Sequence, residues 1–286
     1  MNIKRKIVRL DTPHPQQGFL GPGHTARAVI QNGFAESDPF ILLMDDYLDK
    51  QDDEPVGGPH PHAGFETVSL LIEGAIGEMR TGDLQIMTAG SGVIHTETID
   101  DKAKMRLLQL WLTLPKSNRW AQPRLQDLKA AHAPEMKGDG FNVKVYSGSF
   151  AGITSPIENY VPMIIADIKM EAGKSMLQNI PSDYTTFLYV LDGNVKVGDD
   201  EKSIGMNQVG WLDKYQEHAD SELKLTAGES GARLVLYSAQ PTGDPIVSHG
   251  PFIGNTQEDI MRLYSEYRQG KMKFITDVDE SQLIYY

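Results

Sequence analysis

Two pairs of polar residues in the first third of the chain have the types and spacing needed to bind a metal ion. His60 and His62 flank Pro61, and His95 is followed two residues later by Glu97. Residues i and i+2 of an extended segment point to the same side. A proline between them stiffens the backbone and biases the residue before it toward an extended conformation. Each pair therefore aims its two side chains at one point.

Together, the two pairs predict a site with three imidazoles and one carboxylate. Such a donor set suits one divalent first-row metal ion that keeps one or two positions open for water, O2 or a substrate. The alternative interpretation places His60 and His62 in a loop and makes His95 a hydrogen-bonded core residue. That alternative is favoured for a lone histidine, but two i, i+2 pairs favour the metal site.

The composition excludes several other classes of function. The chain has 286 residues and a formal net charge of -12, so we expect no broad surface for direct nucleic-acid binding. It has no cysteine, which excludes disulfides, thiolate ligands and cysteine nucleophiles. The N-terminus lacks the apolar segment of a secretion signal, and no stretch approaches the roughly 18 apolar residues of a membrane span. We therefore expect a cytoplasmic protein that does not bind a membrane.

The distribution of glycine and proline predicts an all-β protein. The 27 glycines and 16 prolines separate short apolar runs, which is typical of a β-barrel or β-sandwich. The segment 115–140 contains three prolines and is predicted to connect two barrels, with a short helix over 124–133. The candidate strands are 40–44, 66–72, 84–87, 106–114, 143–146, 162–170, 185–191 and 232–238.

The end of the chain predicts a helix, and an internal similarity predicts two related halves. Asn255 is placed to cap the helix N-terminus, with Glu258 at its third position, and Gly270 to follow its C-terminus. The expected docking face consists of Ile260, Leu263, Tyr264 and Tyr267. Segments 66–74 and 185–193 are both apolar runs that end in an acidic residue and a glycine. We therefore expect one domain over 1–134 and a second over 135–286, which ends in the helix.

Taken together, these features resemble the pirin family of the cupin superfamily over nearly the whole chain. The resemblance implies a bicupin fold: two cupin-type antiparallel β-barrels with a few short helices and a C-terminal helix, with metal only in the N-terminal barrel. Its metal ligands map onto His60, His62, His95 and Glu97. The segments that carry the resemblance are 38–46, 60–68, 82–90, 94–97, 108–112, 123–126 and 249–255.

The chain differs in one detail from the general cupin pattern and in another from the pirin pattern. Many cupins take their carboxylate ligand from the position that is Thr67 here, and Glu66 is one place off. Because adjacent strand residues face opposite sides, Glu97 is the better candidate ligand. The connection from Gly74 to Gly82 is shorter than in most pirins. It either lowers one wall of the barrel mouth or has no effect on the site.

The second half lacks an equivalent set of ligands. Asn179 and Pro181 stand at the positions of the two clustered histidines, and proline cannot coordinate a metal. His218 and Asp220 stand at the positions of the other pair, but they lie in a polar run that is typical of a solvated loop. We therefore expect one metal ion per chain.

The resemblance implies two kinds of function. One is a metal-dependent dioxygenase of the quercetin 2,3-dioxygenase type, which opens the central ring of a flavonol with O2. In it the metal acts as a Lewis acid and Glu97 takes the hydroxyl proton. The other is a non-catalytic, metal- or redox-dependent transcriptional co-regulator that binds a protein partner. An unrelated small-molecule substrate is a third possibility. Fe(II) is the expected metal, with Ni, Zn, Mn, Co or Cu as alternatives.

Overall fold

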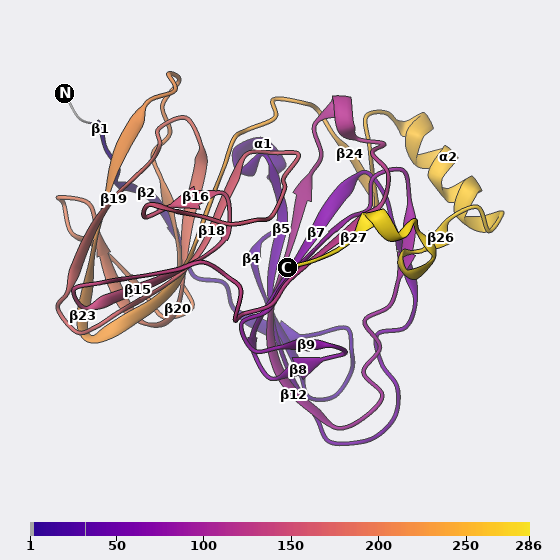
Figure 1. The fold of residues 1–286 in the computed structure, drawn as a ribbon, viewed down its shortest axis with the longest axis horizontal. Coiled ribbons are helices and arrows are strands. Elements are labelled where there is room, and N and C mark those ends of the chain that lie inside the picture. The colour runs from indigo at the N-terminus through magenta and orange to yellow at the C-terminus, as the bar shows by residue number, and fades with distance from the viewer. Residues whose placement is uncertain (1–2, 32) are drawn as a thin grey trace. The chain divides into compact units, whose positions relative to one another are not determined.

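The computed structural model describes residues 3–31 and 33–286, and Figure 1 shows its ribbon. The chain consists mainly of β-strands and divides into two units. We call one of them the histidine unit, which comprises His14–His132 and Thr242–Tyr286. The other, the apolar unit, comprises Met1–Pro13 and Ala133–Pro241. Both are cupin β-sandwiches rather than closed barrels, which confirms the predicted all-β, two-cupin fold.

The histidine unit is built on an eight-stranded sheet with a small three-stranded sheet beside it. The large sheet has the order β27-β13-β10-β7-β12-β5-β4-β3, and the small one has the order β26-β11-β6. The strands of the large sheet are β3 (Pro15–Gln17), β4 (His24–Ile30), β5 (Phe40–Lys50), β7 (Phe65–Glu73), β10 (Leu84–Thr88), β12 (Ala103–Thr113), β13 (Arg124–Leu128) and β27 (Leu283–Tyr285). Those of the small sheet are β6 (His60–His62), β11 (Val93–His95) and β26 (Lys273–Phe274).

Short hairpins and helices complete the histidine unit. The hairpins are β8 (Ala75–Ile76) with β9 (Met79–Arg80), and β24 (Val247–His249) with β25 (Phe252–Gly254). The helices are α1 (Phe34–Ser37), α2 (Gln257–Arg268) and the 3-10 turns Lys116–Asn118, Ile275–Asp277 and Glu280–Gln282. Across residues 3–31 and 33–286, none of the helices is both long and apolar enough to cross a membrane.

The apolar unit is a ten-stranded sheet folded around a core of aliphatic side chains. Its main path is β14-β15-β18-β23-β20-β22-β2, while β1 and β19 also pair with β23 and β21 pairs with β20. The strands are β1 (Ile3–Lys4), β2 (Ile7–Asp11), β14 (Glu135–Gly138), β15 (Phe141–Ser147), β18 (Met163–Met170), β19 (Ser175–Pro181), β20 (Thr185–Val197), β21 (Lys202–Gly205), β22 (Val209–Leu212) and β23 (Asp220–Ala239), with a separate hairpin of β16 (Ser149–Phe150) and β17 (Ile153–Thr154).

Each terminal segment joins the unit built from the opposite half of the chain, which differs from the predicted division into 1–134 and 135–286. Strands β1 and β2 pair with β23 and β22 of the apolar unit. Strands β26 and β27 pair with β11 and β13 of the histidine unit. In Figure 1 the indigo start of the chain accordingly runs among orange strands, and the yellow end lies with purple strands. The terminal strands therefore belong to the units whose strands they pair with, and their backbone groups satisfy N–H and C=O groups of those strands.

The predicted helix over 124–133 is wrong, because its first half is strand β13. This strand pairs antiparallel with β10 on one side and parallel with β27 on the other. Gln126, Asp127 and Leu128 are buried. Pairing on both sides satisfies the backbone of a buried segment, and this tertiary demand overrides a weak helix propensity.

Helix α2 is present, but it begins at a different residue and packs against a different unit than predicted. Thr256, not Asn255, caps the helix: its side chain accepts from the Asp259 backbone N–H, and Asp259 returns the bond. Gly270, with φ of +68°, follows the last helical turn as predicted. The docking face contacts the histidine unit, where Ile260 and Leu263 are buried in one cluster with neighbouring apolar side chains: Ala63, Phe252 and Met272.

The internal repeat corresponds to strands β7 and β20, each a central strand of its sheet. Gly74 and Gly193 have φ of +92° and +68°, and a Cβ at either would lie 2.1 Å from a backbone oxygen of the neighbouring chain segment. Only glycine fits such a close approach at positive φ. The two related segments thus share the same backbone constraint as well as a sequence pattern.

A second repeated feature is a bidentate ion pair across two neighbouring strands. In the histidine unit, Arg106 of β12 donates to both carboxylate oxygens of Asp45 on β5, at 2.8 Å each. In the apolar unit, Arg233 of β23 donates to both oxygens of Asp167 on β18, at 3.2 and 2.8 Å. Both carboxylates are buried, so the fork-like geometry of arginine satisfies them where water cannot.

Strand β7 is buried on both faces and carries a buried carboxyl group. Glu66, Thr88 and Arg124 stand side by side on β7, β10 and β13. The Thr88 hydroxyl donates to Glu66 Oε1 at 2.6 Å. Burial raises the pKa of Glu66 above its ordinary 4.5, although the Thr88 hydrogen bond and the Arg124 charge oppose this. Glu66 therefore tends to keep its proton in the folded protein.

We expect this group to make the protein less stable as pH rises. Above pH 4.5 the unfolded chain releases the Glu66 proton that the folded protein retains, so the free energy of unfolding falls until pH passes the folded-state pKa. Glu66→Gln should remove the contribution of this group, so that stability falls less steeply with pH, and should raise the free energy of unfolding at pH 8 by about 1–3 kcal/mol. Urea denaturation between pH 5 and 8 measures both effects. Glu73→Gln, at the exposed end of the same strand, should leave the slope unchanged. A slope in Glu66→Gln as steep as that of the unaltered protein would contradict the role of Glu66.

Candidate metal centre

The three histidines meet because β6 and β11 pair antiparallel with a fixed register. His60 stands directly opposite His95, and His62 stands opposite Val93. The i, i+2 spacing then turns His60 and His62 to the face on which His95 lies. One nitrogen from each ring lies within 4.8 Å of the others. Within the described part of the chain, these three residues form the group of histidine and carboxylate side chains that is close enough to share a metal ion.

The distances between the rings fit a shared ion. His60 Nε2 and His95 Nε2 are 2.9 Å apart. Imidazole nitrogens bound to one metal at about 2.0–2.1 Å, with bond angles of about 90–110°, stand about 2.9–3.4 Å apart. The ring centroids of the three pairs are 4.4, 4.8 and 4.9 Å apart. The His60–His95 separation therefore fits a shared divalent ion, and the donor nitrogen of His62 lies within 4.8 Å of both.

The protonation states of the rings also suit metal binding. The geometry assigns the proton of His60 to Nδ1, which donates to the Gly58 carbonyl at 2.9 Å and leaves Nε2 unprotonated on the side that faces His95. Burial, reinforced by the neighbouring imidazoles, lowers the pKa of His62 to about 3 and that of His95 to about 2. Both rings are therefore neutral at pH 7, as a metal ligand must be.

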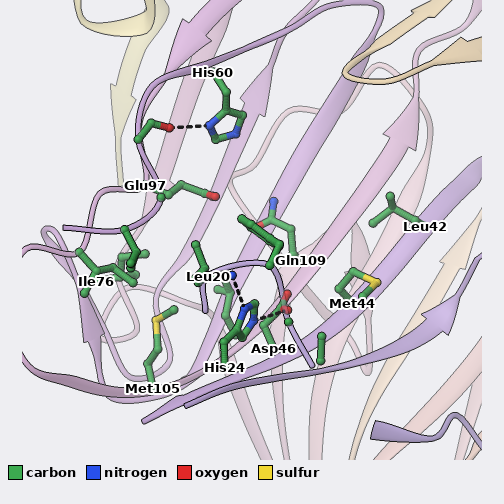
Figure 2. Close-up of a pocket in the computed structure, with 18 of the residues that line it drawn as sticks. Leu20, His24, Leu42, Met44, Asp46, His60, Ile76, Glu97, Met105 and Gln109 are labelled. Carbon is green, nitrogen blue, oxygen red and sulfur yellow. Dashed lines mark hydrogen bonds and ion pairs between the residues drawn. The ribbon is translucent and has the colours of Figure 1, made fainter. Parts of the chain in front are cut away.

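Glu97 lies beside this group but is not one of the three mutually close donors. Its segment is held next to the chain before β6, where the Glu97 N–H donates to the Gly57 carbonyl at 3.3 Å. Gly57 has φ of +77°, and a Cβ there would lie 2.6 Å from the Glu97 carbonyl oxygen. Figure 2 shows the Glu97 side chain below His60, directed into the pocket.

The charge state of Glu97 depends on its surroundings. Burial raises its pKa above 4.5, the nearby Asp46 raises it further, and His60 lowers it. A carboxyl group with a raised pKa binds a proton more readily near neutral pH than an exposed one. Glu97 can therefore accept a proton from a molecule in the pocket, as well as offer an oxygen to a metal.

The three histidines and Glu97 open into a cavity of about 830 Å³. Trp111 lies against both His62 and Phe65, with ring centroids 5.1 and 4.4 Å away. Ile76, from the short hairpin β8–β9, forms part of the wall. The other apolar side chains of the lining are Phe19, Leu20, Ala26, Leu42, Met44, Val56, Ile99, Met105, Leu107 and Pro251. This cavity has the size and lining of a site for a small, largely apolar ligand.

The C-terminal segment pairs with the strands that carry the histidines. The sequence did not reveal this pairing. Strand β26 pairs with β11, so that Phe274 stands beside Ile94. Ala63, directly after His62, exchanges backbone hydrogen bonds with Pro251 and Ile253. The segment 249–255 was among those that resembled the pirins, but its sequence carries no sign of which unit it joins.

Arg119 links the histidine segment to the cap of α2. It is fully buried and donates to the Gly64 carbonyl at 3.1 Å, to the Thr113 hydroxyl at 2.6 Å and to Asn255 Oδ1 at 3.1 Å. Gly64 follows the histidine pair by two residues, and Asn255 precedes the helix cap. A buried guanidinium with these three partners fixes the backbone next to His62.

The equivalent positions of the apolar unit do not form a similar group. Asn179 and Pro181 lie on β19, where Pro181 pairs with Asp220 of β23. His218 is exposed and its Nδ1 lies 2.8 Å from Asp183 Oδ1. The interior of this unit is filled by aliphatic residues such as Val190, Leu234 and Leu236.

We expect Arg119→Lys to destabilise the histidine unit by about 2–4 kcal/mol, because an ammonium group cannot reproduce three hydrogen bonds in different directions. The midpoint and slope of urea denaturation measure the change. Arg268→Lys, on the exposed side of α2, is the matched control and should change stability little. Equal midpoints for the two variants would show that Arg119 does not hold these segments together.

Comparison with known proteins agrees with this architecture. The family model described as Pirin matches residues 24–112, and the model described as Pirin C-terminal cupin domain matches residues 165–273. Pirin from Homo sapiens is 35% identical over 287 residues, which cover 96% of each chain. Pirin-like protein 2 from Arabidopsis thaliana is 32% identical and covers 86% of this chain and 81% of its own.

A solved structure shows the same fold. Quercetin 2,3-dioxygenase from Acinetobacter baumannii superimposes with a TM-score of 0.81 at 26% identity, covering 95% of this chain and 99% of its own. The predicted relationship is therefore confirmed along both cupin units. With a relative 35% identical over nearly its whole length, the chain belongs to the pirin family.

Proposed function

We propose that this protein is a metal-dependent dioxygenase that opens the central ring of a flavonol such as quercetin with O2. The observation that carries the proposal is the position of His60, His62 and His95 at the wall of a largely apolar cavity of about 830 Å³. The similarity to a quercetin 2,3-dioxygenase at 26% identity supports the same reaction class.

The proposed metal is Fe(II), held by the three imidazoles with Glu97 as a fourth ligand. Three nitrogen donors and one carboxylate suit a divalent first-row ion, and the carboxylate favours iron over copper. A bound ion would supply Lewis acidity at the flavonol hydroxyl oxygen. The neutral state of His62 and His95 at pH 7 means that binding requires no loss of protons from those rings.

Glu97 is the proposed general base. Its carboxylate lines the same cavity as the histidines, and its raised pKa suits it to take the hydroxyl proton of the flavonol near neutral pH. The proton would move from the substrate oxygen to a carboxylate oxygen of Glu97, which leaves the substrate as an electron-rich enolate. Glu97 would loosen any bond to the metal as it accepts that proton.

The cavity wall would hold the flat rings of the substrate and exclude water. Trp111, Leu107 and Met44 present aromatic and aliphatic surface to the cavity. Ile76 of the short hairpin contributes to the same wall, so the length of that hairpin bears on which substrates enter.

A regulatory role through a protein partner has less support than the enzymatic role. His62 and His95 are buried and face a cavity, so a small molecule contacts them more readily than a protein surface does. The acidic net charge of -12 would in either case direct a regulator to a protein rather than to nucleic acid.

His60→Ala tests whether the histidines hold the metal. Two imidazoles bind a divalent ion more weakly than three, so the purified variant should contain well below one metal ion per chain and should not consume O2 with quercetin. Elemental analysis and an oxygen electrode measure the two quantities. His132→Ala, which alters an exposed residue outside the cavity, should match the unaltered protein in both. Full turnover in His60→Ala would refute the proposal.

Glu97→Gln tests the proton transfer separately from metal binding. The amide keeps the size of the side chain but cannot take the hydroxyl proton, so kcat should fall about 10²- to 10⁴-fold. The three histidines remain, so metal content should fall much less than in His60→Ala. The assay follows flavonol absorbance in metal-loaded protein. A Glu97→Gln variant with normal kcat would remove Glu97 from the mechanism.

A further inference from the structure

The cavity has a second polar group away from the histidines. His24 is 1% exposed, and its Nε2 lies 2.9 Å from Asp46 Oδ1. The Leu20 backbone N–H donates to His24 Nδ1 at 3.1 Å. Nδ1 is therefore an acceptor, and the ring proton sits on Nε2, where it donates to Asp46. His24 has both nitrogens engaged and holds Asp46 in one orientation.

One carboxylate oxygen of Asp46 remains available to a ligand. Among the described residues, Oδ1 accepts from His24, while Oδ2 has no side-chain partner and the residue lines the cavity. Gln109 is similar: its Oε1 accepts from the Ser69 hydroxyl at 2.9 Å, and within the described chain its amide N–H groups have no partner. A free acceptor and a free donor thus face the same cavity.

The strand register brings these two groups near each other. On β5 and β12, Asp46 stands opposite Leu107, and Gln109 stands opposite Met44. Asp46 and Gln109 are therefore diagonal neighbours on the cavity face, a separation that long side chains bridge. The residues around them are apolar: Leu42, Met44, Met105 and Leu107. Because the surrounding wall is apolar, only water or a bound ligand is left to pair with these two polar groups.

The pair is also separated from the metal ligands. Figure 2 shows His24 and Asp46 at one end of the drawn lining, and His60 with Glu97 at the other. Asp46 is nevertheless close enough for its charge to act on Glu97. A ligand that contacts the histidines can therefore extend to Asp46 within one cavity.

We propose that Asp46, oriented by His24, determines substrate specificity by accepting a hydrogen bond from a phenolic hydroxyl at the end of the flavonol remote from the metal. A hydroxyl group both donates and accepts, so it can satisfy Asp46 and Gln109 at once, whereas an ammonium group can only donate. This inference rests on the proposed function, because it takes the flavonol to be the occupant of the cavity.

The test compares two flavonols in protein kept free of O2, so that no turnover occurs. Quercetin carries hydroxyl groups on its outer rings, and 3-hydroxyflavone has only the hydroxyl that would approach the metal. Isothermal titration calorimetry measures both affinities for the purified protein and for Asp46→Leu. We expect Asp46→Leu to weaken quercetin binding about 10- to 100-fold and to leave 3-hydroxyflavone nearly unchanged.

Two further variants separate the loss of the hydrogen bond from changes in packing and from misfolding. Met44→Leu alters the neighbouring cavity position on β5 without changing a polar group, and should affect both ligands alike. Asp46→Asn keeps the shape and an acceptor oxygen but loses the charge, and should lower the preference for quercetin about 3- to 10-fold. If Asp46→Leu does not fold, Asp46→Asn decides the question by the same ratio.

The outcomes separate this site from the reaction. Equal weakening of both flavonols, or unchanged quercetin binding, in the Asp46 variants would overturn the site even if turnover is normal. Selective loss of quercetin binding in the Asp46 variants would support the role of Asp46 in specificity. This would hold even if the metal-loaded protein did not consume O2, because that failure would count only against the proposed dioxygenase reaction. An unaltered protein that binds neither flavonol would overturn both.

Discussion

The antiparallel pairing of β6 with β11 is the constraint on which the rest of the site depends. It places His60 opposite His95 and, through the i, i+2 spacing, brings His62 to the same face. A shift of one residue would turn the imidazoles to the other side of the small sheet. Three contacts stabilise this register. Gly57 allows the Glu97 segment to approach closely, and β26 pairs with β11. Arg119 donates a hydrogen bond to the Gly64 carbonyl.

Burial gives the site its chemistry and has a cost in stability. It keeps His62 and His95 neutral and raises the pKa of Glu97, so that one pocket holds two neutral imidazoles and a carboxyl group that binds a proton more readily than an exposed one. The cost follows from the same shifts. Between pH 6.5 and about 3, the unfolded chain takes up protons that the folded His62 does not, so in the metal-free protein stability falls as pH falls through this range. A metal ion bound by the three histidines would offset this cost, because it would stabilise only the folded arrangement.

Features encoded in short segments could be predicted from the sequence, and those that depend on distant pairing could not. The i, i+2 histidine pair, the repeat around Gly74 and Gly193, and the stripe of α2 are local patterns, and each is present in the fold. Strand β13 looked helical because its two partner strands lie elsewhere in the chain. The exchange of terminal segments and the His24–Asp46 pair could not be predicted for the same reason. His24 and Asp46 are 22 residues apart in the sequence, and only the fold brings their side chains together.

We propose that one metal ion binds between His60, His62 and His95, with Glu97 beside it. Anomalous diffraction from crystals of the protein loaded with one equivalent of Fe(II), recorded on both sides of the iron absorption edge, tests it most directly. We expect a single peak per chain, within bonding distance of the three imidazole nitrogens and in the histidine unit alone. A peak bound by other residues, or a second one of equal height in the apolar unit, would contradict it.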